Sequence, residues 1–403
     1  MRSLKLLAFA PLHGIGGMSV NEGQLINALS KYSESVYVFS FVSIRQVIFR
    51  QVPKLVFPPN KNVKVIMLPG LPLPIIFLPI IVFYYGLISL FCLIPQKLLN
   101  LSVTYIRDRY VGIPMLMLKR ITKNPIIIKF GAFIADELSP NVRSSLFGNI
   151  FSTLETFVDT YLLRHADIIL VSSLTMKKCI EKRFSVTSKI LLCPAGIDPD
   201  KIRRIAFQKN VKGDKVRIGF LGSLAWWQGV DIVAEAVAIV KEKLPNVELF
   251  IVGDGLMREK IASLCENYKI KYTITGFVSH EEALKYLRSF DVLVLPRRKT
   301  STTESNVPIK VVEAWALGIP VIVTSHEIFR SICKDGEDVL FVEPNPEDVA
   351  EKILLLVSNH ELKERLAKKG LCLAKDFDYN RTACKIVEKF ENLLKEENVI
   401  KAK

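Results

Sequence analysis

Short apolar runs alternate with longer segments of helical periodicity along the whole chain. In its first half, runs rich in β-branched residues predict strands, and the segments between them have the length of helices. These strands are expected at residues 4–10, 36–41, 63–68, 103–106, 126–129 and 168–171, and a first helix at 20–31. Alternation of strands and helices is typical of a parallel sheet covered by helices. The first half therefore predicts a Rossmann-like, doubly wound α/β domain.

The same alternation restarts after a polar stretch that ends near Lys215. Strands are expected at residues 216–221, 247–252, 272–275, 292–295, 321–323 and 339–341, and helices at 229–244, 257–267, 281–289, 308–317, 346–358, 361–374 and 381–397. The helix at 308–317 has Pro308 at its start and Gly318 just past its end, which is the usual asymmetry. Residues 300–307 are expected to form a Ser/Thr-rich loop.

A chain of 403 residues is about right for two domains of roughly 200 residues each. We predict an N-terminal domain over 1–199 and a C-terminal domain over 200–380, with a linker near 195–214. A final helix in 381–403 is expected to pack back across the domains and return to the first. Two doubly wound sheets facing each other would place the ends of their strands in one cleft, where open parallel sheets bind ligands.

Residues 71–94 form a nearly continuous apolar stretch, within a longer segment from Lys64 to Lys97 that has no charged residue between its ends. Its length alone would allow it to span a bilayer. Three prolines, Pro72, Pro74 and Pro79, interrupt its first third and leave residues 80–94 for an unbroken helix. A buried helix and a helix that dips into one leaflet both fit better than a membrane span.

The positive charge is concentrated in the first half of the chain. Residues 1–199 hold 22 Lys and Arg against 10 Asp and Glu, a net +12, and the remainder holds 33 against 30, a net +3. A basic surface attracts nucleic acid, acidic metabolites or anionic lipids. Because no zinc-finger or aromatic RNA-binding signature is present, nucleic acid is the weakest of these partners. The seven scattered cysteines, without a CxxC pair, indicate a reducing compartment and neither a disulfide framework nor a zinc site.

Several motifs of the second half occur in a specific order. They are the segments 219–223 (GFLGS), 229–231 (GVD), 252–255 (VGDG), 276–278 (GFV) and 308–321 (PIKVVEAWALGIPV). In order and spacing they resemble the donor domain of family 4 glycosyltransferases, the group 1 glycosyl transferases. The strong part of the resemblance covers residues 216–345. In the first half, only the glycine loop near Gly16, segments 166–173 and the 194–198 junction resemble the family.

The resemblance implies a GT-B fold and an enzyme of the hexosyltransferase type. Members move a sugar from a nucleotide diphosphate, here UDP- or GDP-linked, usually with retention and without a metal, so no cofactor is expected. The departing diphosphate gains charge as the glycosidic bond breaks, and a site for it needs cations and backbone N–H groups. We expect donor binding at Gly16, Gly17, Gly222, Ser223, Gln228, Gly253, Phe277, Val278, Arg297, Pro308, Ile309 and Glu313, although a strand-to-helix turn is the simpler interpretation of Gly253.

Glu313 matches the family glutamate that holds the ribose hydroxyls, and Lys310 lies three residues before it on the same helix. The family's other glutamate has seven residues between it and this one. Here Ser305 stands at that position, and Glu304 lies one residue earlier, as in a related family pattern with Pro-x-Lys-x-x-Glu. We expect Glu304 to contact the donor sugar and Lys310 to be catalytic. A glutamate on a solvated helix face is the alternative for Glu313.

Two cations common in the family are missing, because Ser223 and Gln228 stand at their positions. We hypothesise that Lys310, together with one of three basic residues of the preceding loop, supplies the charge instead. A solvated run of charges is the alternative for these three residues, Arg297, Arg298 and Lys299.

The acceptor should be held by the first domain, where residues 129–137 follow a buried strand. Asp136 or Glu137 could orient the acceptor hydroxyl, although a helix N-cap is the simpler interpretation. His13, beside the glycine loop, is an alternative contact.

A lipid-linked acceptor or membrane glycan would explain both the basic first domain and the apolar stretch. We therefore expect a cytoplasmic enzyme that is peripheral at the inner face of the cell membrane. Its partners would be a nucleotide sugar, the acceptor and an anionic membrane surface, but no nucleic acid. Two alternatives stay open. One is a catalytically weak, membrane-associated scaffold subunit, and the other is a soluble glycosyltransferase or epimerase of the same fold.

Overall fold

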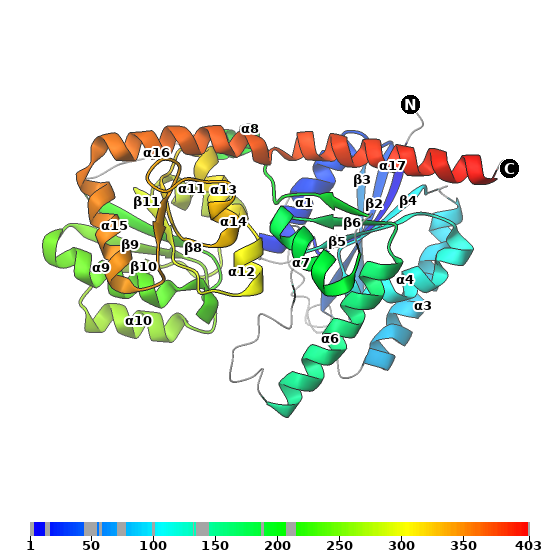
Figure 1. The fold of residues 1–403 in the computed structure, drawn as a ribbon, viewed down its shortest axis with the longest axis horizontal. Coiled ribbons are helices and arrows are strands. Elements are labelled where there is room, and N and C mark those ends of the chain that lie inside the picture. The colour runs from blue at the N-terminus through cyan, green and yellow to red at the C-terminus, as the bar shows by residue number, and fades with distance from the viewer. Residues whose placement is uncertain are drawn as a thin grey trace. The chain divides into compact units, whose positions relative to one another are not determined.

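The computed structural model describes residues 4–12, 17–43, 55, 59–70, 78–98, 101–131, 133, 145–186, 189–206 and 215–401. The chain divides into two compact units, which Figure 1 shows in blue to green with the red C-terminal helix, and in green to orange. Unit 1 comprises Met1–Gly14, Met18–Pro194 and Tyr379–Lys403, and unit 2 comprises Ile15–Gly17 and Ala195–Asp378.

Unit 1 is built on a parallel sheet whose strands follow the order β3-β2-β1-β4-β5-β6-β7. Strand β1 pairs with β2 on one side and β4 on the other, so the sheet reverses its order between β1 and β4. Successive side chains of β1 point to opposite faces, as in any strand: Leu7 and Phe9 join one core cluster, and Leu6 and Ala8 the other. The strands are β1 (Lys5–Phe9), β2 (Ser35–Ser43), β3 (Val63–Gly70), β4 (Val103–Ile106), β5 (Ile126–Phe130), β6 (Ile168–Val171) and β7 (Ile190–Leu192).

Helices cover both faces of this sheet. Three of them begin where a side chain accepts a hydrogen bond from a backbone N–H of the first turn, at Asp108, Ser145 and Ser173. The helices are α1 (Gly17–Ser30), α3 (Leu78–Leu98), α4 (Arg109–Thr122), α6 (Leu146–His165), α7 (Leu174–Phe184) and α17 (Tyr379–Lys401).

Helix α3 contains the expected helix of residues 80–94 and extends beyond it at both ends. Ile81 and Tyr85 lie in the core, whereas Phe83 on the opposite side is 68% exposed. Among the residues that the structure describes, no helix combines the length and apolarity that crossing a bilayer requires.

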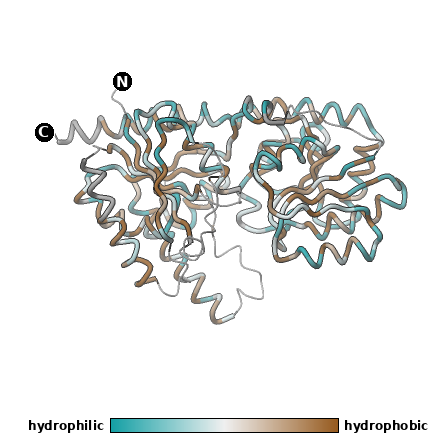
Figure 2. Tube along the Cα trace, turned by 180° about the vertical axis from the view of Figure 1, so that it is seen from behind, coloured by the Kyte–Doolittle hydropathy of each residue, from teal (hydrophilic) through white to brown (hydrophobic). Residues whose placement is uncertain are grey.

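Unit 2 is built on a second parallel sheet, with the strand order β10-β9-β8-β11-β12-β13. Its order reverses between β8 and β11. Figure 2 shows that hydrophobic strands lie at the centre of each unit, with more hydrophilic helices outside. The strands are β8 (Val216–Leu221), β9 (Val247–Val252), β10 (Tyr272–Ile274), β11 (Val292–Leu295), β12 (Val321–Thr324) and β13 (Leu340–Val342).

The helices of unit 2 agree with the expected ones to within a few residues at each end. Helix α8 lies within the region of the expected linker, and Asp198 there accepts a hydrogen bond from the Lys201 N–H. One prediction was wrong. Part of the expected Ser/Thr-rich loop is helix α12, because Thr300 and Thr303 cap each other's backbone N–H groups. The helices are α8 (Pro199–Ala206), η3 (Trp226–Gln228), α9 (Val230–Lys243), α10 (Arg258–Asn267), α11 (His280–Arg288), α12 (Ser301–Ser305), α13 (Ile309–Ala316), α14 (Glu327–Arg330), α15 (Pro346–Ser358), α16 (His360–Leu373) and η4 (Ala374–Phe377).

The last helix, α17, belongs to unit 1 although the preceding residues belong to unit 2. Its residues Tyr379, Ala383, Ile386 and Phe390 are buried in the cluster that also holds Leu6 of β1. The prediction of two Rossmann-like parallel-sheet units, with a C-terminal helix returning to the first, is confirmed.

A buried group of charges lies beneath the start of α17. The Glu22 carboxylate accepts a hydrogen bond from the Tyr105 hydroxyl at 2.5 Å and lies 2.9 Å from Lys129 Nζ and 3.2 Å from Arg107 Nε. Lys129 Nζ also lies 3.4 Å from the Tyr379 hydroxyl. Burial alone would raise the pKa of Glu22, but Lys129 and Arg107 hold it below its usual value. One carboxylate thus compensates the buried Lys129 and the half-buried Arg107.

Candidate functional site

The candidate site lies at the carboxyl ends of the strands of unit 2, where the sheet order reverses between β8 and β11. Ligands of open α/β sheets bind outside such a reversal. Residues 222–229 follow β8, residues 253–257 follow β9, and residues 296–308 connect β11 to α13.

Two glycines allow the turns after β8 and β9 to approach each other closely. The Gly222 N–H donates to the Val252 carbonyl at 2.9 Å. Gly253 has a φ of +145°, and a Cβ there would lie 1.9 Å from the Gly222 carbonyl oxygen. Only glycine fits this conformation without strain. The predicted donor residues Gly222 and Gly253 are therefore neighbours. The close approach of the two turns favours glycine at position 253 even without a ligand.

Lys310, in the first turn of α13, points toward the turn after β8. Its Nζ lies 5.6 Å from the centre of the Phe220 ring, and a Cβ on Gly222 would lie 1.9 Å from it. The Nζ atom is enclosed by protein and has no hydrogen-bond partner among the described residues. Burial, with the nearby Arg297 guanidinium, lowers the pKa of Lys310 to about 7, against the opposing effect of Glu313.

Arg297 follows β11 and is 5% exposed. Its guanidinium carbon stands 5.0 Å from the centre of the Trp227 ring. Arg297 and Lys310 thus place two buried cations beside the turn after β8.

Glu313 lies one helical turn after Lys310 and is 3% exposed. One of its carboxylate oxygens is 2.7 Å from Nε2 of His280, the first residue of α11. Because only Ser279 separates His280 from the 276–278 segment, this contact connects a segment that is expected to bind the donor to the expected ribose-binding glutamate.

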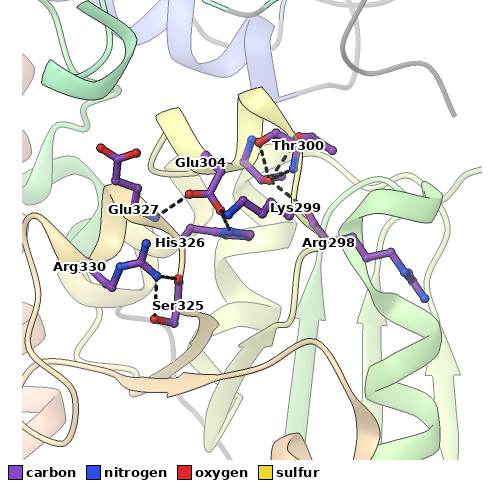
Figure 3. A network of polar contacts seen from close by, with 9 residues as sticks. Arg298, Lys299, Thr300, Glu304, Ser325, His326, Glu327 and Arg330 are labelled. Carbon is purple, nitrogen blue, oxygen red and sulfur yellow. Dashed lines mark hydrogen bonds and ion pairs between the residues drawn. The ribbon is translucent and has the colours of Figure 1, made fainter. Parts of the chain in front are cut away.

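Glu304 belongs to a separate polar group (Figure 3). Its carboxylate accepts a hydrogen bond from the Glu327 N–H at 2.9 Å and lies 2.9 Å from His326 Nδ1. Burial acts to raise the pKa of Glu304, but these two contacts lower it below its usual value. Figure 3 also shows Lys299 directed toward this carboxylate, at 3.8 Å. No group of His, Cys, Asp and Glu that could hold a metal occurs in the part of the chain that the structure describes.

The three basic residues of the loop after β11 have different surroundings. The Arg298 guanidinium forms a two-point ion pair with Asp231 of α9, with distances of 2.9 and 3.0 Å. The Lys299 side chain is 79% exposed. Arg297 alone is among the groups that shift the pKa of Lys310. The structure therefore favours Arg297 as the residue that could act with Lys310.

The remaining predicted donor residues of unit 2 differ in how far they are exposed to solvent. Ser223 is exposed, and its hydroxyl lies 3.4 Å from Nε2 of the buried Gln228. Phe277 is 60% exposed, and Val278 packs against the core. Pro308 caps α13, and Ile309 is its first residue.

Several predictions for the first half fall on residues that the structure does not describe. Gly16, Asp136, Glu137 and His13 lie outside the described residues, and Gly17 is the first residue of α1. The acceptor side therefore stays a prediction from the sequence.

Sequence reasoning missed three residues that hold the expected site residues. His280 contacts Glu313, His326 contacts Glu304, and Asp231 pairs with Arg298. His280 and His326 carried a weak signal, because each follows an expected strand or turn near its carboxyl end. No spacing in the sequence reveals their partners, which lie 33 and 22 residues away.

Known proteins resemble the chain in both sequence and fold. Residues 201–371 match the family model "Glycosyl transferases group 1". An uncharacterized glycosyltransferase of Methanocaldococcus jannaschii is 26% identical over 62% of this chain and 60% of its own length. The phosphatidyl-myo-inositol mannosyltransferase of Mycobacterium tuberculosis is 25% identical over 50% of this chain and 53% of its own length. The chain thus spans little more than half the length of these two relatives.

The crystal structure of HepE from Anabaena in complex with UDP has a TM-score of 0.69 at 16% identity, over 96% of this chain and 100% of that one. This similarity extends to both units and shows the GT-B fold. Together with the family match over residues 201–371 and the ordered motifs around Glu313, it shows a GT-B fold whose second unit is similar to the group 1 glycosyl transferases.

Proposed function

We propose that the protein transfers a hexose from a UDP- or GDP-linked donor to a lipid-linked acceptor or membrane glycan, with retention and without a metal. The observation that carries the donor part is the enclosed, unpartnered Nζ of Lys310 beside Gly222. An amine left without a partner in a buried site is costly, and an anion at this position would compensate it.

In this proposal Lys310 and Arg297 stabilise the charge that grows on the departing diphosphate. Such a contribution is largest in an enclosed site, where water does not screen the charges. Glu313, held by His280, would accept hydrogen bonds from the ribose hydroxyls. Glu304, held by His326 and the N-terminus of α14, would accept hydrogen bonds from hydroxyls of the donor sugar.

Nucleotide recognition is tested by a thermal-shift screen of UDP, GDP, ADP, CMP and UMP. We expect UDP or GDP to raise the melting temperature and the monophosphates to raise it much less, because a ligand that binds only the native state stabilises it. At a concentration 100 times its Kd, a ligand contributes about 2.7 kcal/mol. No shift with any diphosphate would contradict the proposed donor site, and binding without sugar transfer or hydrolysis would favour a scaffold subunit.

The membrane part of the proposal is supported by an exposed apolar surface on unit 1. On α3, residues 80, 83, 87 and 90 are between 49% and 68% exposed, although all are apolar. Helix α4 packs on α3 and adds Met117 and Ile121, at 58% and 54%. We name these six residues, Ile80, Phe83, Leu87, Leu90, Met117 and Ile121, the outer apolar face. Apolar patches of this kind mark interaction sites.

An anionic lipid surface is the occupant that best fits the outer apolar face. Residues 1–199 carry a net charge of +12, which attracts anionic head groups. The M. tuberculosis relative also has a lipid acceptor in its name.

A double substitution, Phe83→Asp with Leu87→Asp, tests this surface by vesicle flotation. We expect the native chain to float with vesicles of phosphatidylglycerol, and the variant to bind at least about tenfold more weakly, since each buried apolar side chain contributes about 1.5–3 kcal/mol. Both residues are exposed, so the fold should persist. The matched control is Leu355→Asp on α15 of unit 2, at a residue 41% exposed. Equal flotation of all three proteins would contradict the membrane surface.

A further inference from the structure

The Lys310 amine is enclosed and has no hydrogen-bond partner in the part of the chain that the structure describes, which is an unfavourable place for a charge. Its Nζ has the Phe220 ring on one side and the Gly222 backbone on another. Glycine at position 222 leaves the room that the amine occupies, since any Cβ there would overlap it. The geometry therefore brings an amine to the turn after β8, where no carboxylate of the described residues forms an ion pair with it.

The charged groups around Lys310 do not favour its ammonium form. Arg297, which follows β11, is a second cation in the same enclosed place. Glu313 on α13 is an opposing anion, but its carboxylate lies at hydrogen-bond distance from His280 of α11. Glu304 on α12 and His326 after β12 lie at hydrogen-bond distance from each other. Burial and Arg297 outweigh Glu313, so the pKa of Lys310 is about 7.

We propose that Lys310 is neutral in the empty donor site above neutral pH and takes up a proton from solvent when a nucleoside diphosphate binds. Donor binding is then coupled to protonation. This inference rests on the proposed function, since it needs the diphosphate to bind at Lys310.

The proton balance follows from the charges. In the empty site, protonation of the amine puts a second buried cation beside Arg297. A bound diphosphate brings negative charge of its own, and an opposite charge within about 4–6 Å favours the charged form of a titrating group. The proton moves from solvent to Nζ, where it gives the ammonium that binds a phosphate oxygen. No proton leaves the nucleotide, because its terminal phosphate, with a second pKa near 6, is already ionised at pH 8.

The coupling predicts how affinity depends on pH. Below pH 7 the amine is already protonated, so binding needs no proton from solvent. Above pH 7 each unit of pH makes the uptake less favourable by about 1.36 kcal/mol, which is a tenfold increase in Kd. We expect the Kd for UDP or GDP to rise by roughly tenfold between pH 7.5 and 8.5.

Isothermal titration calorimetry measures the proton directly. UDP and GDP are titrated into the 403-residue chain at pH 8 in HEPES and in Tris, whose ionisation enthalpies differ. With a pKa of about 7, about nine-tenths of Lys310 is neutral at pH 8, so we expect uptake of roughly 0.9 proton per nucleotide bound. Lys310→Arg should still bind but take up no proton, because arginine remains charged. Lys310→Met should also take up none.

Lys334→Met is the matched control, since this lysine side chain is 76% exposed and pairs with Glu337. It should retain the full proton uptake. Binding without proton uptake in the native protein would overturn the inference and leave the proposed donor site intact. Uptake that persists in Lys310→Arg and Lys310→Met would assign the proton to another group and would also overturn it. Failure of the native protein to bind either diphosphate would contradict the proposed function itself.

Discussion

Replacement of Lys310 by Met should lower turnover by about 10² to 10³-fold, while the Kd for the nucleoside diphosphate changes by less than about tenfold at pH 8. At this pH the ammonium must first be formed, so its net contribution to ground-state binding is small. The charge on the leaving diphosphate grows as the glycosidic bond breaks, and the contribution of Lys310 grows with it. Methionine is similar in length to lysine, is apolar and needs no hydrogen-bond partner, so the protein should remain folded around the buried site.

Turnover is measured as release of the nucleoside diphosphate, or as slow hydrolysis of the nucleotide sugar if the acceptor is not available, and affinity is measured by calorimetry. Lys334→Met serves again as the control, with turnover equal to that of the native protein. If Lys310→Met retained native turnover, neither Lys310 nor the charge it supplies could be part of catalysis. A loss of affinity with native turnover at saturating donor would assign Lys310 to uniform binding of the donor.

Substitution of Glu22 by Gln should destabilise unit 1 by about 3–5 kcal/mol. Glu22 is fully buried and is the carboxylate that contacts both Lys129 and Arg107. Without its charge, two cations remain in the interior with one amide oxygen between them. Lys129→Met should cost less, because Glu22 then keeps Arg107 and the Tyr105 hydroxyl as partners.

Unfolding in urea, monitored by hydrogen exchange of the backbone amides, measures the stability of the two units separately. The exchange of amides in β1, β4 and β5 should accelerate in Glu22→Gln, and that of β8 and β11 should not change. Glu337→Gln, at an exposed ion pair, is the control and should alter neither. Equal stability of Glu22→Gln and the native protein would mean that the two cations find other partners or solvent.

Much of the fold could be predicted from the sequence because local patterns determine it. Pro308 and Gly318 bracket α13 as expected, since proline suits a helix start and Gly318 has a φ of +67° just past its end. The Ser/Thr-rich sequence predicts a loop at residues 301–305, because Ser and Thr disfavour helix interiors, yet the reciprocal capping by Thr300 and Thr303 stabilises a short helix there.

The candidate site was predicted only in part, because its contacts join residues far apart in the sequence. The ordered motifs gave Lys310 and Glu313 without indicating that the Lys310 amine is enclosed. The choice among Arg297, Arg298 and Lys299 depended on Asp231, which lies 67 residues before Arg298. Similarly, Glu22 and Lys129 form an ion pair although more than 100 residues separate them, and no periodicity in the sequence predicts this pair.

The return of α17 to unit 1 has a consequence for synthesis on the ribosome. Unit 2 is nearly contiguous, whereas the core of unit 1 contains residues from both β1 and α17. Domains of a growing chain usually fold in the order in which they emerge, the N-terminal one first. Here the first unit to emerge lacks Tyr379, Ile386 and Phe390 until all of unit 2 has been synthesised. Unit 2 can therefore complete its core first, and until α17 emerges the nascent unit 1 exposes the α17-facing side of its sheet, where chaperones can bind it.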